Sequence, residues 1–195
     1  DNMKPDPYDT KMAKKLMADA GYPNGFKMTI HGPNDRYIND AKIAEALAQM
    51  LNRVGIDASV ETMPKAVYFK RASRGGPNKS PEFSFMLLGW GAGSGEASSP
   101  LKALLHTYDK SKGMGAANRG RHTDAKVDAL IQKALATVDA DARGKLLAEA
   151  TEKAVGENYG VIPMHYQVNT WAAKKGYSYL PRTDERTIVT GLSGS

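Results

Sequence analysis

The chain has 195 residues, of which 41% are hydrophobic and 25% charged, so it has the length and the apolar content for a buried core. Its formal net charge of +6 comes from basic residues that are scattered and interleaved with acids, so we expect no nucleic-acid partner. Cysteine is absent, no apolar run reaches the roughly 18 residues of a membrane helix, and the polar start lacks a leader pattern. The chain is therefore either cytosolic or a mature or excised part of an exported protein.

The first third of the chain has the pattern of a β-α-β unit. Apolar residues at helical spacing predict a helix over residues 9–20, and a short strand follows over 26–32. A single apolar stripe predicts a second helix over 43–54, and alternation predicts a strand over 56–63. Because a helix of this length is typical of a crossover, we expect the two strands to be parallel.

The remainder of the chain alternates helical, loop and strand patterns. We expect a short helix, a flexible loop, a third strand, three helices and a closing strand over 64–73, 74–81, 82–90, 101–108, 127–138, 141–157 and 161–173. Ser99 and Pro100 have the residue types of a helix N-cap and a first helical position, and Asp139 and Asp141 are interpreted as capping residues between two helices.

The last twenty or so residues have turn and strand residue types, but the sequence pattern assigns them no strand partner. The organisation is therefore one α/β domain, with a mixed sheet flanked by helices, followed by a C-terminal arm over residues 176–195.

A glycine-rich stretch, "LLGWGAGSGE" at residues 87–96, follows a predicted strand and precedes a helix, which is the setting of a phosphate-binding loop. Its glycine spacing does not match a dinucleotide fingerprint, and the Gly-Lys-Ser/Thr end of a P-loop is missing. A stand-alone α/β enzyme that binds a phosphorylated substrate at this loop is the alternative hypothesis.

The sequence contains no recognisable catalytic or metal-binding constellation. None of its four histidines has a metal-ligand spacing, and no Gly-x-Ser-x-Gly elbow is present. We therefore expect no catalytic residues, no metal and no cofactor.

Binding is the better-supported hypothesis. Trp90 lies at the carboxyl end of a predicted strand, where open α/β sheets place their ligands, although a core aromatic is an equally good interpretation. Polar and aromatic residues follow the two preceding strands, so three strand ends are expected to converge on one edge. These residues are Asn34, Asp35, Arg36, Lys65, Tyr68 and Phe69.

Several stretches, in order, resemble one known family. "YDTKMAKKLMADAGYPNGF", "NDR" followed by "AEALAQMLNRVGIDASVETM", "LLGWGAG", "TDAKVDALIQKALATVDADAR" and "GVIPMHY" are similar to the C-terminal lobe of the ABC-importer solute-binding proteins of family 5, the peptide, dipeptide and nickel class. The resemblance covers nearly all of residues 8–172. It implies a periplasmic-binding-protein-like lobe.

The resemblance also implies a biological setting. A two-lobed receptor in the periplasm or anchored to the cell surface would bind a small solute or short peptide and deliver it to a membrane ABC permease. Residues 1–175 would be the C-terminal ligand-binding lobe, and the arm over 176–195 would pack on the missing N-terminal lobe. The protein would then be a binding module and not an enzyme.

The family pattern transfers only in part to this sequence. Gly89 and Trp90 match the Gly-Trp that lies along bound peptide, whereas the acid expected three positions after the tryptophan is Gly93. Glu96 is a possible substitute acid. The cations Lys65, Arg71 and Arg119 suggest an anionic or polar ligand. The predicted ligand-binding residues are Gly89, Trp90, Gly91, Ala92, Gly93, Lys65, Tyr68, Arg71, Asn118 and Arg119.

Overall fold

A computed structural model describes residues 3–182, 184 and 186–194. The helices are α1 (Thr10–Asp19), α2 (Asp40–Arg53), α3 (Lys65–Arg74), α4 (Ser98–Pro100), α5 (Ala125–Ala136) and α6 (Ala140–Thr151). The strands are β1 (Lys27–Pro33), β2 (Asp57–Met63), β3 (Tyr177–Tyr179) and β4 (Leu192–Gly194). Shorter helical turns are η1 (Pro77–Lys79), η2 (Leu101–Leu105), η3 (Glu152–Glu157) and η4 (Val189–Gly191). In the described part of the chain, no helix combines the length and apolar character needed to cross a membrane.

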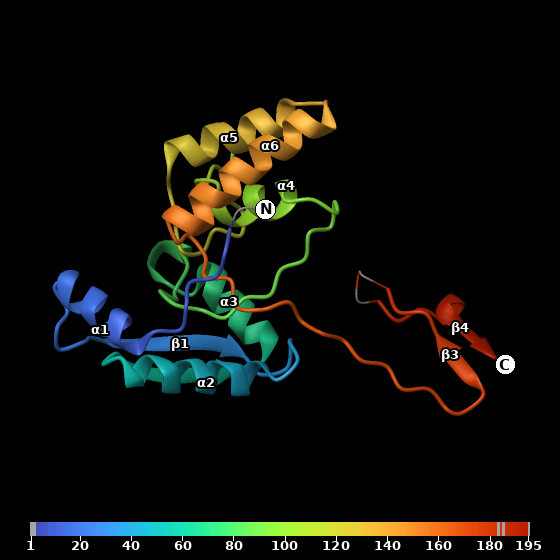
Figure 1. The fold of residues 1–195 in the computed structure, drawn as a ribbon, viewed down its shortest axis with the longest axis horizontal. Coiled ribbons are helices and arrows are strands. Elements are labelled where there is room, and N and C mark those ends of the chain that lie inside the picture. Colours follow the sequence, from blue (N-terminus) through green and yellow to red (C-terminus); the bar gives the residue numbers. More distant parts are fainter. Residues whose placement is uncertain (1–2, 183, 185, 195) are drawn as a thin grey trace.

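The predicted β-α-β unit is confirmed. β1 and β2 pair in parallel along all seven residues of each strand, and α2 connects them and packs against them (Figure 1). Ala44 and Ala48 of α2 are buried in one cluster with Ile30 of β1. Small residues on the buried stripe of the helix let it lie close to the strands, and the outer face of α2 remains exposed.

The predicted third strand over residues 82–90 is present only as a single rung beside β1. The N–H of His31 donates to the oxygen of Phe85 (3.1 Å), and the N–H of Leu87 donates to the oxygen of His31 (2.8 Å). Two residues later β1 reaches Pro33, which has no N–H with which to extend the ladder. The segment predicted as a third strand thus lies parallel to β1, but the predicted extent of the strand is wrong.

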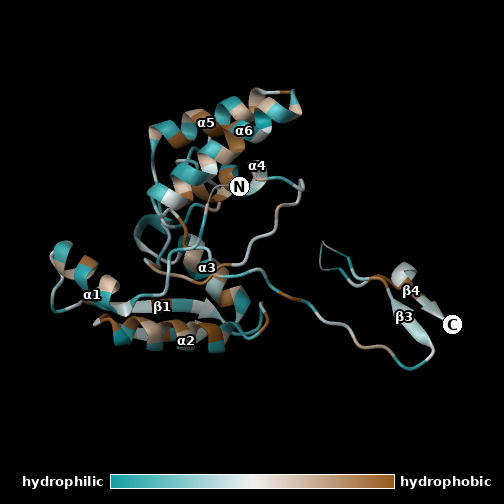
Figure 2. Cartoon of the chain, viewed as in Figure 1, coloured by the Kyte–Doolittle hydropathy of each residue, from teal (hydrophilic) through white to brown (hydrophobic). Residues whose placement is uncertain are grey.

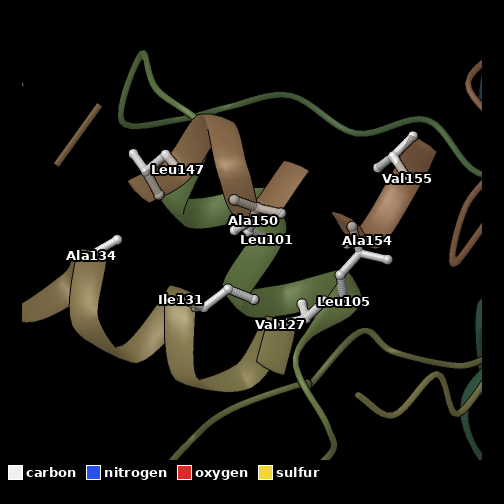
Figure 3. Close-up of a cluster of buried hydrophobic side chains, with 9 residues drawn as sticks. All are labelled: Leu101, Leu105, Val127, Ile131, Ala134, Leu147, Ala150, Ala154 and Val155. Carbon is white, nitrogen blue, oxygen red and sulfur yellow. The ribbon is translucent and has the colours of Figure 1, made fainter. Parts of the chain in front are cut away.

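A second layer is helical and carries its own core (Figure 3). Val127, Ile131 and Ala134 follow the spacing of one face of α5 and are fully buried, so the helix predicted over 127–138 is confirmed. Leu135, expected on the same face, is 36% exposed, and Val138 lies beyond the end of α5 and is exposed. The buried cluster consists of Leu101, Leu105, Val127, Ile131, Ala134, Leu147, Ala150, Ala154 and Val155.

The capping predictions have different outcomes. Asp139 is the N-cap of α6, and its carboxylate accepts the N–H of Ala142 at 2.8 Å, as predicted. Asp141 lies in the first turn of the same helix, where its charge suits the helix dipole.

The cap predicted for the helix after the glycine stretch is wrong. α4 begins two residues earlier than predicted, at Ser98 instead of Pro100, and its N-cap position is Ala97, which has no capping side chain. The hydroxyl of Ser98 instead donates to Glu96, and this contact closes the turn into the helix. The helix then continues through η2 to Leu105.

The closing strand predicted over residues 161–173 is not found, and this segment is extended without a strand partner in the described chain. β3 and β4 follow as an antiparallel hairpin that lies apart from the rest of the chain (Figure 1), with mixed hydropathy along its length (Figure 2). Extended backbone becomes a strand only when a neighbour satisfies its hydrogen-bonding groups, so alternation alone misassigned this segment.

We predict that Ile131→Ala lowers the free energy of unfolding by about 2–5 kcal/mol, because the truncation leaves a cavity among fully buried side chains. Leu135→Ala on the same helix is the matched control, since Leu135 is 36% exposed and its loss should be smaller. Urea unfolding followed by circular dichroism measures both. Equal losses in the two variants would contradict the described core.

Candidate functional site

The loop that follows β1 is held rigidly at the carboxyl ends of both strands. The N–H of Asn34 donates to the oxygen of Met63, the last residue of β2, at 3.1 Å. The carboxylate of Asp40, which is buried at the start of α2, accepts the N–H groups of Arg36 (2.9 Å) and Tyr37 (3.0 Å). A buried carboxylate that accepts several backbone N–H groups fixes the path of the loop.

This loop contacts both of its neighbours. The carboxylate of Asp35 accepts the N–H of Lys65, the first residue of α3, at 2.6 Å. The hydroxyl of Tyr37 donates to the oxygen of Gly89 at 3.3 Å. The prediction that three strand ends converge is therefore confirmed, and we call residues 34–37, Lys65 and residues 89–90 the carboxyl edge.

Two tyrosine hydroxyls donate to carbonyls of the segment beside β1, in place of backbone N–H groups that β1 does not provide. In a parallel ladder the rung after His31 would run from the N–H of residue 33 to the oxygen of Leu87, but residue 33 is proline. The hydroxyl of Tyr68 donates to that oxygen at 2.6 Å. The hydroxyl of Tyr37 likewise donates to the oxygen of Gly89, two residues further along the segment. The side chain of Tyr68 is fully buried, and burial raises its pKa, so the hydroxyl remains a donor.

Gly89 is required by the close approach of Tyr37, because a Cβ at this position would lie 2.6 Å from the Tyr37 ring. Trp90 is 46% exposed, which excludes the core interpretation of its ring within this chain. Beyond it, residues 91–93 are exposed and lack regular structure. A Cβ at Gly93 would meet nothing within 4 Å, so the structure has room for the acid that the family pattern expects there.

Glu96 does not replace the acid missing at position 93, because its carboxylate is hydrogen-bonded to other side chains of the chain. Glu96 accepts hydrogen bonds from Ser98 and from Arg143, whose Nη2 lies 2.8 Å away. These bonds, that of Ser98 foremost, hold the pKa of Glu96 below its usual value. The carboxylate thus closes the glycine loop onto α6.

The charge of Arg71 is matched by two acids, Glu61 and Glu82, which are not residues of the carboxyl edge. It donates from Nη1 to Glu61 at 2.5 Å and from Nε to Glu82 at 3.0 Å, and its guanidinium lies over the ring of Phe83. Its hydrogen bonds lower the pKa of both carboxyls. Since two acids match its charge, Arg71 ties β2, α3 and the following segment together.

Asn118 and Arg119 also have structural contacts. Asn118 is buried, and its amide donates to the oxygens of His106 (3.0 Å) and His122 (2.7 Å). Arg119 donates from Nε to Ser73 at 3.1 Å and lies over the ring of Phe69. These contacts hold the loop that precedes α5 against itself and against α3.

The structure therefore brings only part of the predicted set together. Gly89, Trp90 and Lys65 lie at the carboxyl edge, and Tyr68 supports it from the core. Sequence reasoning missed Tyr37 and Asp40, although an aspartate that follows a loop and starts a helix was a signal for a carboxylate that accepts backbone N–H groups of that loop. No cluster of three potential metal ligands occurs among the described residues.

Comparison with known proteins gives one consistent result. Residues 1–112 match the family described as bacterial extracellular solute-binding proteins, family 5 Middle. Heme-binding protein A of Haemophilus influenzae is 30% identical over 156 residues, which are 77% of this chain and 26% of that protein. The chain thus spans about a quarter of the length of this relative.

Two solved structures are similar to the chain. HbpA2 from Haemophilus parasuis matches 100% of this chain and 37% of its own, with 26% identity and a TM-score of 0.78. The ABC transporter-associated periplasmic binding protein DppA from Helicobacter pylori, in complex with the peptide STSA, matches 77% of this chain and 28% of its own, with 30% identity and a TM-score of 0.66.

We predict that Tyr68→Phe lowers the free energy of unfolding by about 1–3 kcal/mol, because it leaves the oxygen of Leu87 without its donor in a buried site. Tyr22→Phe is the matched control, since Tyr22 is 51% exposed and its hydroxyl has no hydrogen bond within the described residues. Urea unfolding measures both variants. A loss no larger for Tyr68→Phe than for Tyr22→Phe would refute the role of this hydroxyl.

Proposed function

Because the chain belongs to the bacterial extracellular solute-binding proteins of family 5, we propose that it is a ligand-binding lobe of a receptor that delivers a small solute or short peptide to an ABC importer. Its relatives are transport-binding proteins, and we propose that this chain likewise binds its solute without chemical conversion. The proposed location is the periplasm or the outer cell surface.

An open backbone edge at Leu88 and Trp90 carries this proposal. In the segment beside β1, residues 85, 87 and 89 direct hydrogen-bonding groups toward β1 and the two tyrosines. Leu88 and Trp90 alternate with them and face the opposite way, as strand geometry requires. Their backbone groups have no backbone partner among the described residues.

Such an edge suits an extended ligand. A peptide that adds itself to an exposed strand gains main-chain hydrogen bonds, whatever its side chains are, and Trp90 offers a half-exposed ring beside that edge. The similar DppA structure is in complex with a peptide, so one relative of this fold binds a peptide. Heme in the name of another relative shows that members of the family differ in solute.

The arm supports the proposal that a second lobe exists. Residues 1–175 would form the ligand-binding lobe, and the arm over 176–195 would pack on an N-terminal lobe of the same receptor. The extended stretch before the arm exposes Ile162, Tyr166 and Val168, and the arm exposes Leu180. Exposed apolar side chains on an extended segment are typical of a surface that packs against another body.

We predict that removing residues 176–195 from this chain leaves its unfolding midpoint unchanged, because the hairpin lies apart from the body (Figure 1). The same deletion in a longer receptor that contains the N-terminal lobe should lower the midpoint. Thermal unfolding followed by circular dichroism compares the two backgrounds. An unchanged midpoint in both would overturn the proposed docking of the arm.

Ligand binding is tested with the longer receptor after Trp171→Phe, which leaves Trp90 as the fluorescent tryptophan of this lobe. We expect mass spectrometry under native conditions to detect a co-purifying solute, and Trp90 fluorescence to change when that solute is returned to the emptied receptor. Trp90→Ala should weaken binding by at least about tenfold, because aromatic rings at the centre of an interface carry much of its affinity. Binding that is unaffected by Trp90→Ala would argue against this edge as the ligand site.

A further inference from the structure

We propose that α1 and the turn after it bind the surface of an anionic phospholipid membrane. The residues concerned are exposed apolar and aromatic side chains with lysines beside them, and we call them the α1 surface: Lys11, Met12, Lys15, Leu16, Tyr22 and Phe26. The inference goes beyond the proposed receptor function, because it concerns where the protein is held and not which solute it carries.

The helix α1 contacts the body of the molecule through a narrow face. Asp9 caps it, and the carboxylate of Asp9 accepts the N–H groups of Lys11 and Met12, both at 2.9 Å. Met17 packs against the cluster that contains Ile30. None of the ten residues of α1, all of which the structure describes, is buried. Most of the helix surface therefore faces outward.

This outward surface carries an apolar ridge that two aromatic rings extend. Met12 and Leu16, four positions apart on one side of the helix, are 50% and 58% exposed. Tyr22 and Phe26 are also exposed and lie edge to face, with ring centroids 5.2 Å apart. The N–H of Tyr22 donates to the oxygen of Met17 at 2.8 Å, which holds the turn against the end of α1. Large apolar side chains that gather in this way mark a contact surface.

Lysines form the next row round the helix. Lys11 and Lys15 each precede a residue of the apolar ridge by one position, and both side chains are exposed. Within the described residues Lys11 has no ion pair, whereas Lys15 pairs with Asp19 at 2.6 Å in an exposed contact, which holds it only weakly. With three lysines and one aspartate, α1 complements an anionic surface.

The residue types favour lipid over a protein partner. Protein interfaces are depleted in lysine, whereas lysine and tyrosine beside aliphatic side chains are typical of the boundary between membrane and water. Lysine stems lie along apolar surface there and place the ammonium among the head groups. The proposed receptor delivers its solute to a permease in a membrane, so it works beside such a surface.

The position of α1 is compatible with this role. The helix lies at the amino end of β1, and the carboxyl edge lies at the other end of the same strand (Figure 1). A membrane that contacts the α1 surface therefore leaves the proposed ligand site accessible.

Sedimentation with lipid vesicles tests the inference on the 195-residue chain and on the longer receptor. The probes are vesicles of phosphatidylcholine alone and vesicles that contain roughly one-third phosphatidylglycerol. We expect both proteins to bind the anionic vesicles at least about tenfold more tightly than the neutral ones. Binding should weaken as salt is raised, because dissolved ions screen exposed charges.

Two double variants separate the charged and the apolar contributions. Lys11→Gln with Lys15→Gln should weaken binding to the anionic vesicles by at least about tenfold, because two charges near the lipid surface are lost. Met12→Gln with Leu16→Gln should weaken it similarly, because no apolar ridge remains to enter the head-group region. Glutamine favours helix and all four positions are exposed, so the circular dichroism spectrum should not change.

Lys126→Gln with Lys133→Gln is the matched control, since it removes the same charge from exposed positions on α5 and should bind within about twofold of the unaltered chain. An equal loss in this control would show attraction by net charge alone and refute the assignment to α1. Absence of binding to the anionic vesicles would refute the proposal outright.

The remaining occupants of the α1 surface are distinguished by the same preparations. If the 195-residue chain binds vesicles and the longer receptor does not, the other lobe covers this surface and the proposal is wrong. If sedimentation velocity instead shows dimers that Met12→Gln with Leu16→Gln dissociates, and no vesicle binding, the partner is a second copy of the chain and the proposal is again wrong. Neither result bears on solute binding at the carboxyl edge.

Discussion

The missing N–H of Pro33 is the constraint from which the geometry of the carboxyl edge follows. Because proline ends the donor series of β1, the neighbouring segment pairs with β1 at a single rung. The carbonyls of Leu87 and Gly89 in that segment instead accept the hydroxyls of Tyr68, from α3, and of Tyr37, from the loop after β1. Side chains on two separate elements thus hold the backbone where a strand would have held it, and they leave its outer edge uncovered.

The charged side chains near the carboxyl edge also have structural contacts. The carboxylates near the edge cap a helix, close a loop or pair with an arginine, so each has a place in the fold. Arg71, the most tightly paired cation of the predicted set, is a cross-link between elements. The charge available to a ligand is therefore what remains after the fold has used its own acids and bases.

Sequence reasoning recovered the features that depend on local periodicity. The β-α-β unit and the stripe on α5 follow from spacing along the chain, and both are confirmed. The extent of the third strand was mispredicted because it depends on a proline in a neighbouring strand. The partners of Arg71 come from β2 and from the segment after α3, so no local pattern could show that its charge is matched.

The free space around Gly93 has an evolutionary consequence. A Cβ at this exposed position would meet no atom within 4 Å, so a side chain can begin here without displacing the core or the tyrosine contacts. A substitution at this position can therefore change the charge of the loop after Trp90 while leaving the fold intact.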